Sequence, residues 1–254
     1  MLLAIDIGNT NITLGLFGTR DLAATWRIST DVGRMPDEYG LMLNELLRLR
    51  ELSPDDVDEV VLCSVVPPLT PTFVNLCKAY FNAVPLVVGA GTRTGVRVLY
   101  DSSRDVGADR IADAVAALKL YGGPVIVVDV GTATVFDAIT KDGSYLGGAI
   151  APGMSIAADA LFHSTAQLRR IELNAPREAI GKNTVQAIQS GVVLGYSELI
   201  RGMVKRFDRE LGGDSRVIAT GGLAQVVEGE VKIFDAVNLD LTLVGLKLIH
   251  EMNT

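Results

Sequence analysis

Two short segments of the chain have the same form, and together they constrain the fold more than any other feature. AIDIGNTN covers residues 4–11 and VVDVGTAT covers residues 127–134. In each segment an apolar run reaches an aspartate, continues for one apolar residue and breaks at a glycine followed by small polar residues. This pattern is typical of a buried strand that ends in a turn. Because it occurs twice in a chain of 254 residues, it predicts two related halves.

The elements expected after each segment come in the same order. In the first half the pattern predicts strands at 2–7, 11–17 and 23–29, a helix at 36–50, a strand at 60–66 and a helix at 68–80. In the second half it predicts strands at 125–130, 134–140 and 145–151, a helix at 152–162, a long helix at 184–210, a strand at 216–220 and a helix at 239–252. The helices carry apolar residues every three or four positions, as burial of one side requires.

This repetition predicts an α/β protein with a duplicated β-β-β-α-β-α core and a mixed sheet in each half. We expect one domain at 1–122 and a second at 123–254, with a helix at 105–120 leading towards the boundary. Ligands favour the interface between domains, so an active-site cleft is expected between the two halves.

The composition argues against several classes of protein. The net charge of −7 and the absence of a basic cluster argue against a nucleic-acid partner. Only two cysteines and two histidines are present, and Cys63 and Cys77 lack metal-ligand spacing, so we expect two buried core thiols and no zinc site. No apolar stretch reaches the roughly 20 residues of a membrane span, and no cleavable signal is evident. We therefore expect a cytoplasmic protein that binds no membrane.

The turns that follow Asp6 and Asp129, here called the two Asp-Gly turns, have the composition of a phosphate site. Glycine lets the backbone approach a ligand, and successive N–H groups with Thr and Asn side chains form an anion cradle. A buried carboxylate such as Asp6 or Asp129 needs a cation, because an unpaired buried charge is costly. Phosphate with magnesium meets both needs, and on this reasoning both aspartates are assigned to magnesium. An ordinary hairpin turn would explain one copy, but not two that open matching halves.

A third glycine segment, TGG at 220–222, ends a predicted strand. Its glycine pair would permit the flat approach of an adenine or ribose, and a plain strand-to-helix turn explains it equally well. A Walker loop does not account for phosphate binding, since the only Gly-Lys pair has Pro176 where the first glycine belongs and Asn183 where Ser or Thr belongs.

Five segments taken together resemble the type III pantothenate kinases, a family within the superfamily of sugar kinases, actin and heat-shock chaperones. The segments are DIGNTN at 6–11, GADR at 107–110, DVGTAT at 129–134, GGAIAPG at 147–153 and TGG at 220–222. The resemblance implies two ribonuclease-H-like domains of the actin-like ATPase type. It also implies transfer of the γ-phosphate of ATP to the primary hydroxyl of pantothenate, which gives 4'-phosphopantothenate in the first step of coenzyme A biosynthesis.

The resemblance further implies roles for single residues. Asp109 would be the general base, Asp6 would act on Mg²⁺ through phosphate or water, and Asp129 would hold a monovalent cation, K⁺ or NH₄⁺. The ATP-binding positions would be Asp6, Ile7, Gly8, Asn9, Thr10, Asn11, Ile12, Thr13, Thr132, Gly221 and Gly222. The positions that bind pantothenate would be Tyr100, Gly107, Ala108, Asp109, Arg110 and Thr184, the last reaching the pocket from the other subunit of a homodimer.

Some of these residues also have a plain structural explanation. At the start of a helix, Asp109 would favour the helix dipole and could pair on the surface, and without the resemblance this interpretation comes first. Thr184 opens the long helix, where a capping role would explain it. A mean hydropathy of +0.32 is high for a soluble monomer and favours a shared apolar surface. Two other functions stay open, a phosphohydrolase of the same superfamily and a nucleotide-binding regulator without catalysis.

Overall fold

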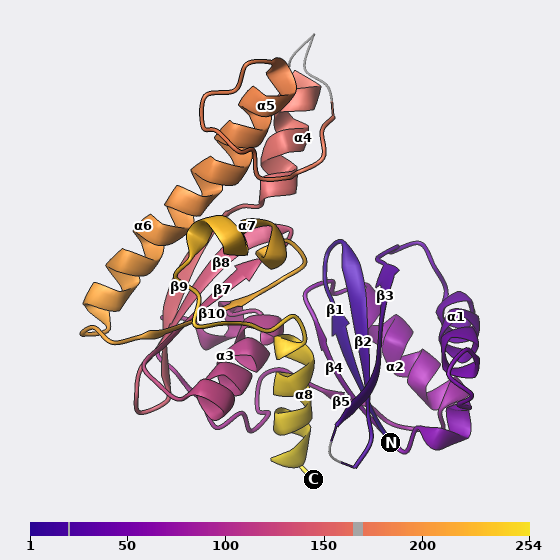
Figure 1. The fold of residues 1–254 in the computed structure, drawn as a ribbon. Helices are drawn as coiled ribbons and strands as arrows, with labels where there is room; N and C mark the ends of the chain where they lie inside the picture. Colours follow the sequence, from indigo (N-terminus) through magenta and orange to yellow (C-terminus); the bar gives the residue numbers. More distant parts are fainter. Residues whose placement is uncertain (20, 165–169) are drawn as a thin grey trace. The chain divides into compact units, whose positions relative to one another are not determined.

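The computed structural model describes residues 1–19, 21–164 and 170–254 (Figure 1). The chain forms two compact units. Unit 1 consists of Met1–Gly95, Ser102–Ala116 and Thr242–Thr254. Unit 2 consists of Val96–Asp101 and Ala117–Leu241.

Unit 1 is built on a five-stranded mixed sheet with the strand order β3-β2-β1-β4-β5. The strands are β1 (Leu2–Ile7), β2 (Asn11–Phe17), β3 (Leu22–Ser29), β4 (Glu59–Ser64) and β5 (Leu86–Val87). The central strand β1 runs antiparallel to β2 and parallel to β4. The helices are α1 (Pro36–Arg48), α2 (Leu69–Tyr80), the first part of α3 (Ala108–Tyr121) and nearly all of α8 (Leu241–Glu251), with short 3₁₀ turns at Pro54–Asp56 and Ser103–Asp105.

The two faces of this sheet have different partners. Leu3, Ile5 and Ile7 of β1 belong to one core cluster with residues of α1 and α2, including Tyr39 and Phe73. Successive side chains of a strand point to opposite faces, so Asp6 lies on the face that α1 and α2 do not cover. On that face α8 packs against β2, since a Cβ atom on Gly15 would lie 2.9 Å from a methyl carbon of Leu243. A Cβ on Gly245 would lie 2.0 Å from the carbonyl oxygen of Ala112, so α8 also lies directly against α3.

Unit 2 is built on a six-stranded sheet with the strand order β11-β10-β7-β8-β9-β6. Its strands are β6 (Arg97–Val98), β7 (Val125–Val130), β8 (Ala133–Ile139), β9 (Ser144–Pro152), β10 (Arg216–Thr220) and β11 (Ala236–Val237). Without β6, the order matches that of unit 1 strand for strand, and β7 again runs antiparallel to its hairpin partner β8 and parallel to β10. The α/β class and the duplicated core are therefore confirmed.

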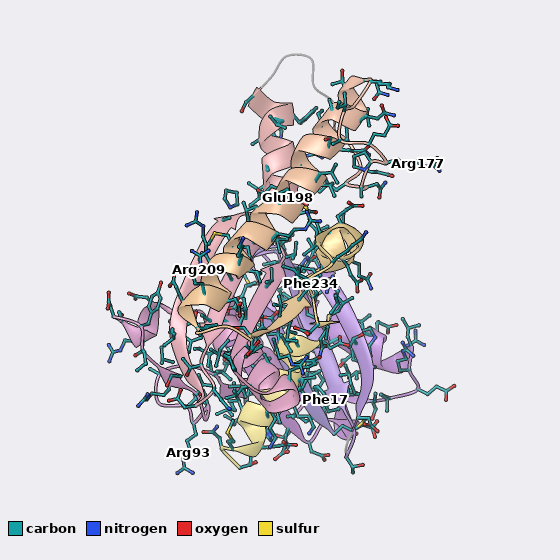
Figure 2. All side chains as sticks on the ribbon, turned by 60° about the vertical axis from the view of Figure 1, so that its left-hand side comes forward. Phe17, Arg93, Arg177, Glu198, Arg209 and Phe234 are labelled. Atoms are coloured by element: carbon teal, nitrogen blue, oxygen red, sulfur yellow. The ribbon has the colours of Figure 1, made fainter. Side chains whose placement is uncertain are left out.

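The helices of unit 2 are α4 (Met154–Ser164), α5 (Thr184–Gln189), α6 (Gly195–Glu210) and α7 (Ala224–Val231), and the end of α3 also belongs to this unit. In Figure 1, α6 crosses the sheet while α4 and α5 lie beyond its end. A π-helical segment, Ser190–Leu194, joins α5 to α6, so the predicted long helix is continuous but not regular. Ile200 and Val204 of α6 are buried in the core, whereas Glu198 and Arg209 are exposed on the same helix (Figure 2).

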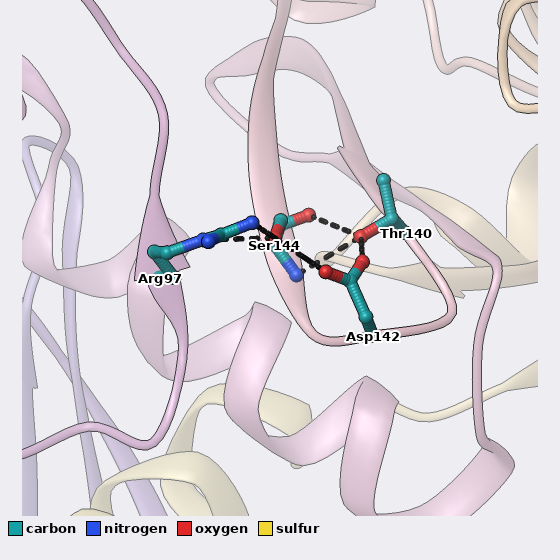
Figure 3. A network of polar contacts seen from close by, with 4 residues as sticks. All are labelled: Arg97, Thr140, Asp142 and Ser144. Carbon is teal, nitrogen blue, oxygen red and sulfur yellow. Dashed lines mark hydrogen bonds and ion pairs between the residues drawn. The ribbon is translucent and has the colours of Figure 1, made fainter.

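Asp142 and Gly143 form the hairpin turn between β8 and β9, and this turn also holds a strand from elsewhere in the sequence (Figure 3). Gly143 has a φ of +81°, a backbone angle that favours glycine. Thr140 Oγ1 donates to Asp142, and Ser144 Oγ donates to the same carboxylate at 3.2 Å. The guanidinium of Arg97 donates to Ser144 Oγ at 2.9 Å, which ties β6 to the edge of β9.

The sequence did not predict the two-residue strands β5, β6 and β11, the helix α7 or the 3₁₀ turns. The predicted helix at 105–120 begins later, at Ala108, because residues 103–105 form a 3₁₀ turn. Within the described ranges, no helix has both the length and the apolar character needed to cross a membrane. The domain division at residue 122 and the cleft between the domains stay predictions.

Candidate active site

The first Asp-Gly segment forms a tightly held turn between β1 and β2. Gly8 N–H donates to the carbonyl oxygen of Asn11 at 3.0 Å and closes the turn. Thr30, just after β3, braces it with two bonds, from Oγ1 to the Gly8 carbonyl at 2.6 Å and from its N–H to the Thr10 carbonyl at 3.0 Å. Ile7 and Ile12 anchor the turn in the core. The exposed residues Asn9, Thr10 and Asn11 are thus presented on a fixed backbone.

Asp6, the last residue but one of β1, lies beside this turn in an environment that disfavours its charge. Its pKa is raised to about 7, first by burial and then by the negative charge of Asp109. A hydrogen bond from the Cys63 thiol at 3.3 Å and the positive charge of Arg27 act in the opposite direction. The carboxyl group is therefore only partly ionised near neutral pH, and a bound cation would favour its ionised form.

Asp109 lies in the first turn of α3, and the residues on either side of it fix its carboxylate. Arg110 N–H donates to Asp109 Oδ1 at 2.8 Å. A Cβ atom on Gly107 would lie only 2.3 Å from the same oxygen, so this position accommodates glycine alone without a shift of the carboxylate. Burial raises the pKa of Asp109, and the hydrogen bond and charge of Arg110 lower it. The structure thus brings the GADR and DIGNTN segments together within unit 1.

The second Asp-Gly segment ends β7 in unit 2, and the TGG segment closes over it. Gly221, with a φ of +90°, lies so close that a Cβ would stand 2.2 Å from Asp129 Oδ1 and 2.6 Å from the carbonyl carbon of Val130. Leu223 N–H donates to the Val130 carbonyl at 2.9 Å and secures the turn. This approach explains why glycine stands at 221. A nucleotide contact at Gly221 or Gly222 stays a prediction.

The GGAIAPG segment also meets the second Asp-Gly turn. Gly153 N–H donates to the Thr132 carbonyl at 3.1 Å, and a Cβ on Gly153 would lie 2.2 Å from that oxygen. At the other end of the segment, Gly147 has a φ of +127°, and the ring of Tyr100 lies 3.1 Å from where its Cβ would be. Tyr100, a predicted substrate residue, is thereby held against β9 in unit 2 with part of its ring exposed.

Thr184 is the first residue of α5, and the residue before it is the helix cap. The side chain of Asn183 accepts a hydrogen bond from Gln186 N–H at 2.9 Å, so a capping role does not explain Thr184. Thr184 lines an open pocket of about 780 Å³ in unit 2, between α4 and the α5–α6 helix. Its other lining residues include Ala157, Leu161, Ile188 and Tyr196.

Cys63 is the residue at this site that sequence reasoning missed. Its apolar neighbours predict a core thiol, and it is indeed fully buried. Its side chain nevertheless lies on the Asp6 face of the sheet, and Cys63 is the direct partner of Asp6 in the parallel pairing of β4 with β1. Side chains alternate between the two faces of a strand, so Cys63 points away from the core cluster that contains its neighbour Leu62. This alternation is the sequence signal that could have placed Cys63 at the site.

Comparison with known proteins agrees with this arrangement of motifs. The family model for type III pantothenate kinase matches residues 2–206. A type III pantothenate kinase from Roseiflexus sp. (strain RS-1) is 51% identical over 253 residues, which are 100% of this chain and 99% of the relative. One from Moorella thermoacetica is 48% identical over 254 residues, and the match covers 100% of both chains.

A solved structure shares the fold at low sequence identity. The inorganic polyphosphate/ATP-glucomannokinase from Arthrobacter sp. strain KM matches with a TM-score of 0.51 and 16% identity, over 99% of this chain and 98% of that one. The family itself is shown by the full-length relatives, and the chain belongs to the type III pantothenate kinases.

Proposed function

We propose that the chain transfers the γ-phosphate of ATP to the primary hydroxyl of pantothenate with Asp109 as the general base. The observation that carries this assignment is that the negative charge of Asp109 acts on Asp6, which stands just before the first phosphate-type turn. Phosphoryl transfer passes through a loose transition state, so the protein mainly positions the reactants and neutralises charge. A carboxylate beside the hydroxyl can orient it and accept its proton as the bond to phosphorus forms. The raised pKa of Asp109 makes it a better proton acceptor than an exposed carboxylate.

The residues around Asp6 fit a magnesium ion that is shared with the nucleotide. Mg²⁺ prefers oxygen ligands and is commonly held by one or two carboxylates together with phosphates and water. Asp6 offers such a carboxylate next to a turn rich in N–H and hydroxyl donors. Within the described ranges no group of three or more His, Cys, Asp or Glu side chains could hold a metal by itself, which favours an ion completed by phosphate and water. When bound, Mg²⁺ would offset the charge of the phosphates.

In unit 2 we assign Thr132, Gly221 and Gly222 to ATP, and Asp129 to a monovalent cation. The Asp129 carboxylate lies where Gly221 closes over the end of β7, and carboxylate oxygens are the ligands that hard cations prefer. Activity measured in K⁺, NH₄⁺ and Na⁺ salts at constant ionic strength tests this role. We expect K⁺ and NH₄⁺ to stimulate turnover and Na⁺ to have little effect. Equal rates in all three would count against Asp129 as a cation ligand.

Pantothenate would lie against Tyr100 and Arg110, and Thr184 would reach it from a second copy of the chain. The homodimer is supported by exposed apolar residues on and around α4 and α5, among them Ile156, Leu161 and Val185. Sedimentation velocity should give the mass of a dimer, and Val185→Glu should shift it towards the monomer. A monomer at micromolar concentration in the unaltered chain would overturn this part of the proposal.

The reaction itself is tested by incubating the pure protein with ATP, Mg²⁺, K⁺ and pantothenate, and by analysing the products by mass spectrometry. We expect 4'-phosphopantothenate and ADP in equal amounts. Phosphate release without phosphopantothenate would instead indicate the phosphohydrolase. Nucleotide binding with no product of either kind would indicate the regulator.

A further inference from the structure

Cys63 and Asp6 are paired by the sheet itself. β4 runs parallel to β1, and the register places Cys63 directly beside Asp6. Both side chains point to the face opposite the core cluster that contains Ile5, Ile7 and Leu62. The thiol donates to Asp6 Oδ1 over 3.3 Å, within the range for a sulfur donor. The contact therefore depends on two adjacent strands and not on a mobile loop.

The thiol serves as a neutral donor. Cys63 is fully buried, and its S–H group donates its hydrogen to the Asp6 carboxylate. A neutral donor can orient the carboxylate without cancelling its charge, so the charge stays available to a cation on the nucleotide.

Charges of both signs act on the Asp6 carboxylate. Asp109 repels the Asp6 carboxylate, while the charge of Arg27 attracts it from β3. Arg27 pairs with Thr13, and Thr13 pairs with Asp6, so Cys63, Asp6, Thr13 and Arg27 form one row across four strands. In this row Cys63 stands on one side of Asp6 and Arg27 lies beyond Thr13 on the other. The hydrogen bond from Cys63 reaches one oxygen of a carboxylate that lies between these opposing charges.

We propose that Cys63 is a positioning residue that holds the Asp6 carboxylate in the orientation required to bind magnesium-ATP. This inference rests on the proposed role of Asp6 in nucleotide binding. It assigns a function to a buried thiol that would otherwise belong to the core.

The test compares two substitutions at Cys63 with one at Cys77. Cys63→Ala removes the donor, and Cys63→Ser keeps a donor at the same place. Cys77→Ala is the matched control, since Cys77 is the second fully buried free thiol of unit 1 and packs in the α1–α2 core cluster on the other face of the sheet. For each variant we would measure the dissociation constant of MgATP by calorimetry, kcat, and KM for MgATP and for pantothenate.

We expect Cys63→Ala to raise the dissociation constant and KM for MgATP by about three- to ten-fold, as loss of one net hydrogen bond predicts. KM for pantothenate should stay within two-fold. Cys63→Ser should recover most of the lost affinity, and Cys77→Ala should lose thermal stability without a change in MgATP binding. Equal MgATP affinity in Cys63→Ala and the unaltered chain would overturn the proposal, as would equal losses in Cys63→Ser and Cys63→Ala.

A double-mutant cycle establishes whether Cys63 acts through Asp6. In an Asp6→Asn background, the effect of Cys63→Ala on MgATP binding should largely disappear, whereas two independent residues would give additive losses and contradict the inference. The cycle is read from binding and does not depend on turnover. If the protein bound MgATP but made no phosphopantothenate, the proposed function would fail while the role of Cys63 would still be decided.

Discussion

Asp6 at the end of β1 and Asp109 in the first turn of α3 act on each other within unit 1, and the negative charge of Asp109 contributes to the raised pKa of Asp6. Two neighbouring carboxylates with different environments can have different functions. One can engage a cation with the phosphates while the other accepts a proton from the attacking hydroxyl. Their difference in role should appear when each is replaced by its uncharged isostere.

Asp109→Asn should abolish most turnover and leave nucleotide binding intact. Loss of a general base typically lowers kcat by about 10²- to 10⁴-fold, and we expect a change of that order. Steady-state kinetics and calorimetry with MgATP would measure the two effects. Asp105→Asn is the matched control, because Asp105 is an exposed aspartate in the 3₁₀ turn just before α3. Near-normal kcat in Asp109→Asn would remove Asp109 from the role of base.

Asp6→Asn should stabilise the protein at high pH in the absence of magnesium and nucleotide. The pKa of Asp6 is raised from 3.8 to about 7 in the folded state, so the folded protein binds the proton more tightly than the unfolded chain does. The contribution of Asp6 to the free energy of unfolding is therefore greatest below about pH 4. It falls as the pH rises towards 7 and is constant above that.

Urea denaturation between pH 5 and pH 8 would measure this dependence. At pH 8 we expect Asp6→Asn to raise the free energy of unfolding by about 1–2 kcal/mol, less than the full linkage value because the buried amide of Asn also costs free energy. The gain should shrink towards pH 5. A difference between variant and unaltered chain that stays constant over this range would contradict the raised pKa.

Gly221→Ala should disrupt the end of β7. The residue has a φ of +90°, and the new Cβ would collide with the Asp129 carboxylate and the Val130 backbone. We expect a loss of at least about 2 kcal/mol in the free energy of unfolding, with a weaker response to K⁺. Gly229→Ala in α7 is the control, since its Cβ would meet nothing within 4 Å and alanine favours a helix. Equal stability of the two variants would show that the turn adapts.

Thr134→Val should make the protein more stable. Thr134 is fully buried, and its Oγ1 has no hydrogen-bond partner among the residues that the structure describes. Replacing an unpaired buried hydroxyl with a methyl group of the same shape should raise the free energy of unfolding by about 1 kcal/mol. Ser144→Ala offers the opposite case, because its hydroxyl is bonded to Arg97 and Asp142, and it should lower stability by a similar amount. Thermal and urea unfolding would compare the two.

The long strands and helices were predictable because their apolar residues repeat with a clear period. β1 and β7 each contain six residues, enough to show an apolar run that reaches an aspartate. The duplication was predicted from this shared pattern. β5, β6 and β11 contain two residues each and show no period. Their pairing is set by the neighbouring strand, as when Arg97 lies beside Ser144.

The site was predictable only in part, because side-chain contacts depend on register. Asp6 and Asp129 were assigned to magnesium because each stands before a phosphate-type turn, whereas Asp109 was singled out only by the family resemblance. Cys63 shows the limit most directly. Its neighbours indicate burial, but the partner of its thiol depends on which residue of β1 stands opposite, and a single-residue slip would reverse the face.

The position of α8 at the end of the sequence determines when unit 1 can be completed during synthesis. Thr242, its second residue, donates to Asp113 on α3 at 2.7 Å, and Leu243 packs over Gly15 of β2. The face of unit 1 that carries Asp6 is therefore completed by residues that the ribosome adds long after β1. The N-terminal strands must wait through the synthesis of all of unit 2 before their second face is covered, and translation sets a lower limit on the time to a finished site.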